Sequence, residues 1–220
     1  MVNKNYHQAK FELSASSPSS LPPELGFEVA FAGRSNSGKS SSLNRVCQQK
    51  SLARTSKTPG RTQLINFFSI PDGRYLVDLP GYGYAKVPDK VKRQWQRFIE
   101  TYLDTRWTLK GLVLVMDIRH PLKEYDKLML GWAAKKKLAV HVLLNKSDKL
   151  KRGEVNNTLF KVRKELKNFT TAGSADMTVQ TFSASKGDGL DELWSLLDSW
   201  LYKEEDEEEG KEADQDKSTI

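Results

Sequence analysis

The sequence predicts an α/β fold of three layers, with helices on both faces of a mostly parallel sheet. Short apolar runs alternate with longer segments of helical periodicity from residue 27 to residue 202, which is typical of parallel strands joined by helices. The turn residues Pro71-Asp72-Gly73 separate two neighbouring apolar runs and indicate a hairpin. The sheet should therefore contain one antiparallel strand pair among parallel strands.

The chain divides into an extension, one main domain and a tail. Residues 1–21 are expected to form an N-terminal extension with an edge strand around Phe11–Ser14, followed by a Ser- and Pro-rich linker. Residues 22–202 should form the main domain. Residues 203–220 contain nine acidic side chains, and such a run is typical of a disordered tail.

Within the main domain, the elements are expected in alternation. The run at 27–32 is short and mostly apolar, as in a strand buried on both faces. Leu43, Val46 and Cys47 would share the inner face of a helix at 40–47. Apolar runs predict the hairpin strands at 66–70 and 74–79 and later strands at 111–116, 139–144 and 177–182. Helical patterns predict helices at 90–103, 122–137, 153–168 and 190–202.

A glycine-rich loop separates the first strand from the first helix. Gly33-Arg34-Ser35-Asn36-Ser37-Gly38-Lys39-Ser40 fits G-x-x-x-x-G-K-S, in which backbone N–H groups and the lysine cradle a polyphosphate. Gly33 and Gly38 can adopt a positive φ, so the loop can wrap an anion closely. The following helix N-terminus adds partial positive charge. Lys39 should reach the β- and γ-phosphates, and the Ser40 hydroxyl should coordinate Mg²⁺.

A second polar element ends the strand at 74–79. Asp78-Leu79-Pro80-Gly81 places an aspartate before a Pro-Gly turn, and we expect Asp78 to hold Mg²⁺ through water while the Gly81 N–H senses a γ-phosphate. Residues 50–63 lack sustained apolar periodicity and could become ordered when a γ-phosphate arrives. Thr62 is the first candidate for a second Mg²⁺ hydroxyl, and Thr58 competes with it.

A base-recognition motif follows the strand at 139–144. Asn145-Lys146-Ser147-Asp148 fits N-K-x-D, at the sheet edge where ligands bind in open α/β folds. Asp148 can accept hydrogen bonds from the guanine N1–H and exocyclic amine, a pattern that adenine lacks. Lys146 would lie along the ring, Asn145 would hold the loop, and the Ala184 N–H could donate to the guanine O6. The phosphate and base motifs together predict GTP as the ligand.

The expected site therefore draws on five segments, at 33–40, 60–64, 78–81, 145–148 and 182–184. The residues expected to act in catalysis are Lys39, Thr62, Gly81 and Asn36, and the expected metal ligands are Ser40, Thr62 and Asp78. The nucleotide contacts are expected from Gly33, Arg34, Ser35, Asn36, Ser37, Gly38, Lys39, Ser40, Gly60, Arg61, Thr62, Gln63, Leu64, Asp78, Leu79, Pro80, Gly81, Asn145, Lys146, Ser147, Asp148, Phe182, Ser183 and Ala184.

These motifs, in this order, resemble the translation-factor-like P-loop GTPases. The stretches 51–68 and 77–85, and Asp117-Ile118-Arg119-His120-Pro121-Leu122, resemble the EngB (YihA/YsxC) family within them, and the likeness extends from Phe11 to Tyr202. The resemblance implies a three-layer P-loop GTPase fold and hydrolysis of GTP. It also implies a bacterial switch in assembly of the large ribosomal subunit, with ribosomal RNA as a partner and links to cell division and septation.

Three positions bear on the expected mechanism. Tyr82 follows Gly81, where Ras-like switches carry a glutamine that orients the attacking water, so slow intrinsic hydrolysis is expected. Asn36 resembles an asparagine by which some related GTPases hold K⁺, and a hydrogen-bonding turn residue is the alternative. Ser185 stands where many relatives carry a lysine that stacks on guanine. Only Lys146 would then cover the ring, and modest affinity is expected.

The charge is distributed unevenly along the chain. Removing the nine acidic and three lysine residues of 203–220 from the 35 basic and 28 acidic residues leaves 32 against 19, a net charge of +13. Basic residues interleaved with aromatic ones suit RNA, although a solvated helix face with Trp95 packed inward is the alternative. The interleaved residues flank Asp78 and are Arg54, Lys57, Arg61, Tyr84, Lys86, Lys90, Lys92, Arg93, Trp95 and Arg97.

The remaining features favour a cytoplasmic monomer. No apolar stretch reaches the ~20 residues that cross a bilayer, and the N-terminus lacks an apolar signal core. Cys47 is expected to be a buried small hydrophobe, and His141 a hydrogen-bonded core residue. Glu124 and Asp126 are expected at the surface.

Two other functions stay open at this point. A P-loop kinase of a small metabolite would use the phosphate loop but would have no use for 145–148. A septation or scaffold protein would hold its nucleotide as a structural ligand. Multiple-turnover GTP hydrolysis and nucleotide-dependent co-sedimentation with ribosomal subunits would distinguish these functions from a GTP-driven switch.

Overall fold

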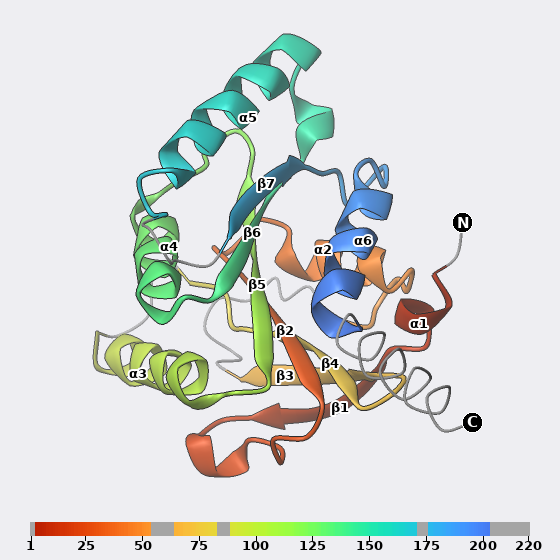
Figure 1. Ribbon diagram of the computed structural model, residues 1–220, viewed down its shortest axis with the longest axis vertical. Helices are drawn as coiled ribbons and strands as arrows, with labels where there is room; N and C mark the ends of the chain where they lie inside the picture. The colour runs from red at the N-terminus through yellow and green to blue at the C-terminus, as the bar shows by residue number, and fades with distance from the viewer. Residues whose placement is uncertain (1–2, 54–63, 83–88, 171–175, 203–220) are drawn as a thin grey trace, which may run out of the picture.

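A computed structural model describes residues 3–53, 64–82, 89–170 and 176–202 of the chain (Figure 1). One seven-stranded sheet, in the order β1-β3-β4-β2-β5-β6-β7, forms the middle layer. Helices cover both of its faces (Figure 1). The predicted three-layer α/β class is therefore confirmed.

The sheet is parallel except at one side. Strands β2 (Phe27–Gly33), β4 (Arg74–Asp78), β5 (Leu109–Asp117), β6 (Ala139–Asn145) and β7 (Met177–Thr181) run parallel. Strand β3 (Ile65–Ile70) is antiparallel to β4, as the hairpin turn predicts, and also to β1 (Lys10–Ala15) at the edge. Residues 10–15 thus lie at the edge of the sheet, where an edge strand was expected around Phe11–Ser14. The second antiparallel pairing that they add was not expected.

The helices enclose a separate apolar core on each face. Helices α3 (Asp89–Thr105), α4 (Glu124–Lys136) and α5 (Arg152–Leu166) cover one face, and α1 (Lys4–His7), α2 (Lys39–Val46) and α6 (Leu190–Leu201) cover the other (Figure 1). Short 3₁₀ turns lie at Pro18–Ser20 and Ser147–Lys149. Cys47 is fully buried in the core beneath α2 and α6, as expected. None of the helices in the described part of the chain is long and apolar enough to cross a bilayer.

Helix α4 begins two residues later than the sequence predicts. Leu122 has a φ of 56°, outside the right-handed helical region, and Lys123 is extended. The Lys123 N–H donates to Asp126 Oδ2 at 2.9 Å, so Asp126 caps the new helix start. The expectation that Asp126 lies at the surface is wrong, because its side chain turns inward and the residue is 1% exposed.

A buried ionic cluster ties β2 to α3 at the amino end of the strand. Glu28 is fully buried and pairs with Arg106. It also accepts hydrogen bonds from the Tyr102 hydroxyl at 2.8 Å and the Thr108 hydroxyl at 3.0 Å. A buried carboxylate is tolerated only with such partners. This end of the sheet lies opposite the predicted nucleotide loops.

Candidate nucleotide site

The predicted motifs converge at the carboxyl ends of the parallel strands. Strand β2 ends at Gly33 and leads into the glycine-rich loop, β4 ends at Asp78, and β6 ends at Asn145. The loop after β7 contains Ser183 and Ala184. Ligands bind at this edge in open α/β sheets. Segments more than 100 residues apart in the sequence therefore form one site.

The glycine-rich loop needs its two glycines for different reasons. Gly38 has a φ of 93°, and a Cβ there would lie 2.1 Å from Asn145 Nδ2. Gly33 does not adopt a positive φ, which corrects the suggestion that it would. A Cβ at Gly33 would instead lie 2.6 Å from the Val115 carbonyl oxygen. Close approach, not backbone conformation, requires this glycine. Asn36 holds a second left-handed position within the loop, with a φ of 64°.

Lys39 and Asp78 form an ion pair where the phosphate loop meets β4. The Lys39 Nζ contacts Asp78 Oδ1, and both side chains are only 9% exposed. Ser40, the next residue on α2, is partly exposed. A hydroxyl and a carboxylate supply the hard oxygen ligands that Mg²⁺ prefers. Ser40 and Asp78 are therefore residues that could hold a metal ion.

Asn145 joins the phosphate loop to both base-recognition loops. Its Nδ2 donates to the Ser37 carbonyl oxygen at 2.9 Å. Its Oδ1 accepts from the Lys146 N–H at 2.8 Å and from the Ala184 N–H at 3.1 Å. The predicted role of Asn145 in holding the loop has a direct geometric basis. The Ala184 N–H, expected to read guanine O6, already has this acceptor.

Lys146 lies between the phosphate loop and an aspartate that the motif analysis did not assign. It has a φ of 67°, and its Nζ donates to the Asn36 carbonyl oxygen at 2.6 Å and to Asp117 Oδ2 at 2.9 Å. The Arg119 guanidinium also pairs with Asp117, and Arg119 and Lys146 together hold the pKa of this carboxyl well below its usual range. The sequence signal that could have identified Asp117 as a site residue is its position at the end of β5, because ligands bind at the carboxyl ends of parallel strands.

Asp148 is held as an anion beside the loop that follows β7. Its Oδ1 accepts from the Ser183 hydroxyl at 2.7 Å, and its Oδ2 lies 3.0 Å from Lys149 Nζ. These contacts lower the pKa of Asp148 to about 2. The carboxylate is therefore ionised at neutral pH and can accept from N–H groups.

Arg45 supports the same loop from helix α2. Its Nε donates to the Ala184 carbonyl oxygen and its Nη2 to the Ser185 carbonyl oxygen, both at 2.7 Å. A guanidinium that bonds two successive carbonyl groups fixes the course of the backbone between them. Sequence reasoning missed Arg45, since only the fold brings α2 next to this loop.

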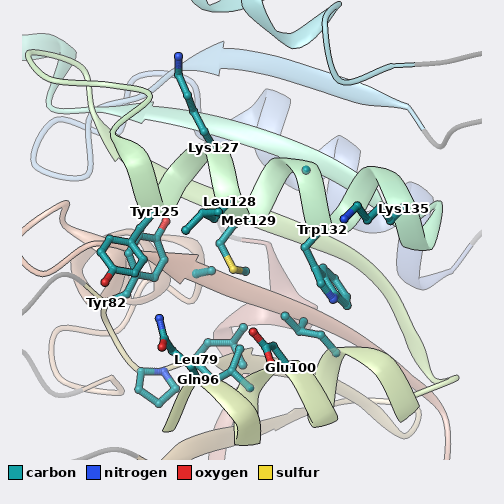
Figure 2. A pocket seen from close by; sticks show the side chains of 15 residues that line it. Leu79, Tyr82, Gln96, Glu100, Tyr125, Lys127, Leu128, Met129, Trp132 and Lys135 are labelled. Atoms are coloured by element: carbon teal, nitrogen blue, oxygen red, sulfur yellow. The ribbon is translucent and has the colours of Figure 1, made fainter. Parts of the chain in front are cut away.

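The side chain of Tyr82 points away from the nucleotide loops, toward Asp126 and the space between α3 and α4. The residue is 4% exposed, and its hydroxyl donates to Asp126 Oδ1 at 2.8 Å. It forms one end of a cavity of ≈ 360 Å³ between α3 and α4. Figure 2 shows Tyr82 beside Tyr125, with Trp132 toward the other end. Leu79 and Pro80 are buried in the same wall.

The remaining expected contacts fall into two groups. Gly60, Arg61, Thr62 and Gln63, with the competing Thr58, lie outside the described residues, and Leu64 is partly buried just before β3. Phe182 is fully buried, so its side chain supports the loop from within the core. The Phe182 carbonyl oxygen accepts from the Ser147 N–H at 3.1 Å, which joins the two base-recognition loops.

Comparison with protein-family models identifies GTPases along most of the chain. A model described as "50S ribosome-binding GTPase" matches residues 28–146. A second, "Elongation factor Tu GTP binding domain", matches residues 96–203. These matches favour a GTPase over a kinase of a small metabolite.

Individual relatives agree with the family models. "Probable GTP-binding protein EngB" of Escherichia coli O139:H28 is 52% identical over 214 residues, which cover 97% of this chain and 100% of that protein. A crystal structure of a probable GTP-binding protein EngB has a TM-score of 0.65 at 22% identity, covering 80% of this chain and 99% of that one. Era in complex with MgGDPNP and nucleotides 1506–1542 of 16S ribosomal RNA has a TM-score of 0.58 at 23% identity, covering 80% and 57%. With such identity along nearly its whole length, the chain belongs to the EngB family of P-loop GTPases, which hydrolyse GTP.

Proposed function

We propose that this GTPase is a nucleotide-dependent switch in assembly of the large ribosomal subunit in the cytoplasm. It would bind ribosomal RNA in one nucleotide state and release it in the other. The observation that carries the proposal is the match of residues 28–146 to a family described as ribosome-binding. A net charge of +13 on residues 1–202 supports an RNA partner.

Phosphate binding in this proposal begins with the Lys39–Asp78 ion pair. The ammonium group would move to the β- and γ-phosphates, and the Asp78 carboxylate, with the Ser40 hydroxyl, would become free to hold Mg²⁺. When bound, Mg²⁺ neutralises the charge that develops on the phosphates. The Gly81 N–H would sense the γ-phosphate, and Thr62 or Thr58 would provide the remaining hydroxyl.

Base recognition would rest on Asp148, Lys146 and Ala184. The Asp148 carboxylate, held in place by the Ser183 hydroxyl and Lys149, would accept from the guanine N1–H and amine. The aliphatic stem of Lys146 would cover the ring while its ammonium group stays with Asp117. The Ala184 N–H would share its bond to Asn145 Oδ1 with the guanine O6 or exchange one acceptor for the other.

Asn36 would have a double role in this proposal. Its carbonyl oxygen is bonded to Lys146, and its side chain is exposed at the entrance of the phosphate loop. This exposed amide is what a K⁺ ion beside the phosphates would contact. Faster turnover in KCl than in NaCl would support the potassium role, and equal rates would remove it.

The RNA surface would include the exposed outer side of α3. Arg93 and Arg97 are exposed there. Other basic residues of the proposed surface lie outside the described residues, namely Arg54, Lys57, Arg61 and Lys86. The structure also does not describe the side chains of Lys90, Lys92 and Trp95. The solved Era complex contains ribosomal RNA, so RNA binding is compatible with this fold.

Co-sedimentation with large ribosomal subunits tests the proposed function. The purified chain should sediment with subunits in one of two conditions, GDP or the non-hydrolysable analogue GppNHp, and much less in the other. Lys39→Ala should abolish the difference because it loses the phosphates. Cys47→Ala, in the core behind the same helix, should keep it. Equal sedimentation with both nucleotides, together with multiple-turnover hydrolysis, would contradict the switch.

Asp148→Asn tests base recognition separately. An amide presents an N–H donor where the carboxylate presents an acceptor, which suits the second carbonyl of xanthine. The variant should lose guanine selectivity and gain preference for XTP, measured by competition against labelled GTP. A variant that still strongly prefers GTP over XTP would contradict the assignment of Asp148.

A further inference from the structure

Tyr82 lies at the position where Ras-like switches carry a glutamine that orients the attacking water. Its side chain instead forms a buried hydrogen bond with Asp126. Its hydroxyl donates to Asp126 Oδ1 at 2.8 Å, and the whole residue is 4% exposed. The ring lies against Tyr125, with 6.0 Å between the ring centroids. A group that is buried and bonded in this way is not available to a water molecule at the phosphates.

The backbone of Tyr82, by contrast, is joined to the phosphate loop. The Tyr82 N–H donates to the Gly33 carbonyl oxygen at 3.3 Å, and its carbonyl oxygen accepts from the Ser35 N–H at 2.9 Å. Upstream, the Leu79 N–H donates to the Phe31 carbonyl oxygen at 2.9 Å. Gly81 therefore lies in a short segment that is attached to β2 and its loop on both sides.

Asp126 gives this segment a fixed point outside the site. Its other oxygen caps the start of α4 through the Lys123 N–H at 2.9 Å, and the residue is 1% exposed. The Tyr82 side chain thus connects the segment beside the phosphates to the N-terminus of a helix that packs on the sheet. A buried hydrogen bond to a carboxylate restrains both partners more firmly than an exposed one.

We propose that Tyr82 is a positioning residue, whose hydrogen bond to Asp126 holds the Gly81 N–H where a γ-phosphate would bind. This inference rests on the proposed role of Gly81 as the γ-phosphate sensor. An amide that is already in place needs no reorganisation when the phosphate arrives. GDP lacks that phosphate, so the bond should favour GTP over GDP and change GDP binding little.

The chain contains a closely matched control for removal of this hydroxyl. Tyr102 is also buried and donates to a buried carboxylate, Glu28 Oε2, at the same distance of 2.8 Å. Glu28 is the second residue of β2, whereas the loop contacts of Tyr82 begin at the last residue, Gly33. Five residues of strand separate the two ends by about 16 Å. Tyr82→Phe and Tyr102→Phe therefore remove the same atom from the same kind of bond at opposite ends of one strand.

The test compares the affinities of the two variants for GppNHp and GDP, with the midpoint of thermal unfolding measured alongside. Both substitutions should lower the midpoint. Tyr82→Phe should reduce the ratio of GppNHp affinity to GDP affinity about fivefold, the effect expected from one hydrogen bond. Tyr102→Phe should leave the ratio unchanged. Equal ratios in all three proteins, or a ratio that rises in Tyr82→Phe, would overturn the inference.

A double-mutant cycle with Asp126→Asn separates a shared bond from two independent defects. If Tyr82 and Asp126 act through their bond, the double variant should lower the affinity ratio no further than the more severe single variant. Multiplied effects would contradict the inference. Loss of guanine nucleotide binding by the unmodified chain would instead contradict the proposed function itself, so the two failures are distinguishable.

Discussion

At the scale of single residues, Asp117 has a clear consequence for base recognition. Its carboxylate binds the Lys146 ammonium group at 2.9 Å and is itself paired with Arg119. With its ammonium group held, the stem of Lys146 is fixed beside the place expected for the guanine ring. The neutral side chain of Asp117→Asn would hold the lysine less firmly.

Asp117→Asn should therefore weaken binding of GDP and GppNHp alike by about fivefold, the effect of one charge-assisted hydrogen bond discounted for partial exposure. Fluorescence titration with labelled nucleotides measures this. Asp104→Asn is a suitable control, because it removes the ion pair with Lys136 at 2.9 Å, outside the nucleotide motifs. If both variants bind as the unmodified chain does, Asp117 does not position Lys146.

Ser37 is a second residue with a specific expectation. It is 3% exposed, and among the residues that the structure describes its hydroxyl has no hydrogen-bond partner. A buried hydroxyl without a partner is unfavourable. Ser37→Ala should thus raise the free energy of unfolding by about 1 kcal/mol and leave GDP affinity unchanged, because Asn145 bonds the Ser37 carbonyl oxygen, which remains. A lower unfolding midpoint in thermal denaturation would contradict this reasoning.

At the scale of secondary-structure elements, His141 on β6 links the sheet to the base-recognition side. Gln180 Nε2 donates to the Gly189 carbonyl oxygen at 2.7 Å, which turns its Oε1 toward His141 Nε2 at 3.0 Å. Nε2 must then carry the proton, and Nδ1 accepts from the Thr178 hydroxyl at 2.7 Å. The expected core histidine is confirmed, and burial lowers its pKa to about 4.

The sign of the resulting pH dependence follows from this depressed pKa. As pH falls, the unfolded chain takes up a proton on His141 near pH ~6.5, before the folded chain does. The stability that neutral His141 contributes is therefore fully present above that pH and is lost as pH falls toward 4. The free energy of unfolding should fall by up to ~3 kcal/mol across this range. In urea denaturation at several pH values, His141→Gln should show a smaller fall. His7→Gln, at an exposed position, should show the same fall as the unmodified chain. Parallel curves for the unmodified chain and both variants would contradict the prediction.

The elements differ in how far the sequence could predict them. The buried strands, such as β6 with its nearly continuous apolar run, were predicted within two residues because burial on both faces leaves a distinct pattern. Helix α1 was missed because four polar-flanked residues carry no periodicity, and Tyr6 is buried in the core beneath α2 and α6, which only the fold brings next to it. Asp126 could not be placed, since its burial depends on Tyr82, 44 residues away. The motif residues were predictable, whereas Arg45 required knowledge of which loops meet.

At the scale of the whole molecule, the separation of charge between residues 1–202 and 203–220 should control RNA affinity. A chain that ends at Tyr202 carries +13 in place of +7 and should release more counterions from RNA. It should bind a ribosomal RNA fragment more tightly than the full chain at low salt, with a steeper dependence of affinity on salt. The difference should shrink as salt screens the charges.

A full-length control separates charge from length in this experiment. Changing the six acidic residues at 204–209 to their amides also gives a net charge of +13. This variant should bind as the shortened chain does, measured by filter binding across a salt series. If it behaves like the unmodified chain, charge in the tail does not control RNA affinity.

The solitary thiol offers a practical advantage for following such a molecule in motion. Cys47 is fully enclosed by the core, and burial raises its pKa to about 12. Thiol reagents attack the thiolate, so at neutral pH this sulfur should stay unmodified while a cysteine introduced on an outer helix reacts. Dyes or spin labels can thus be attached pairwise without first removing a native site.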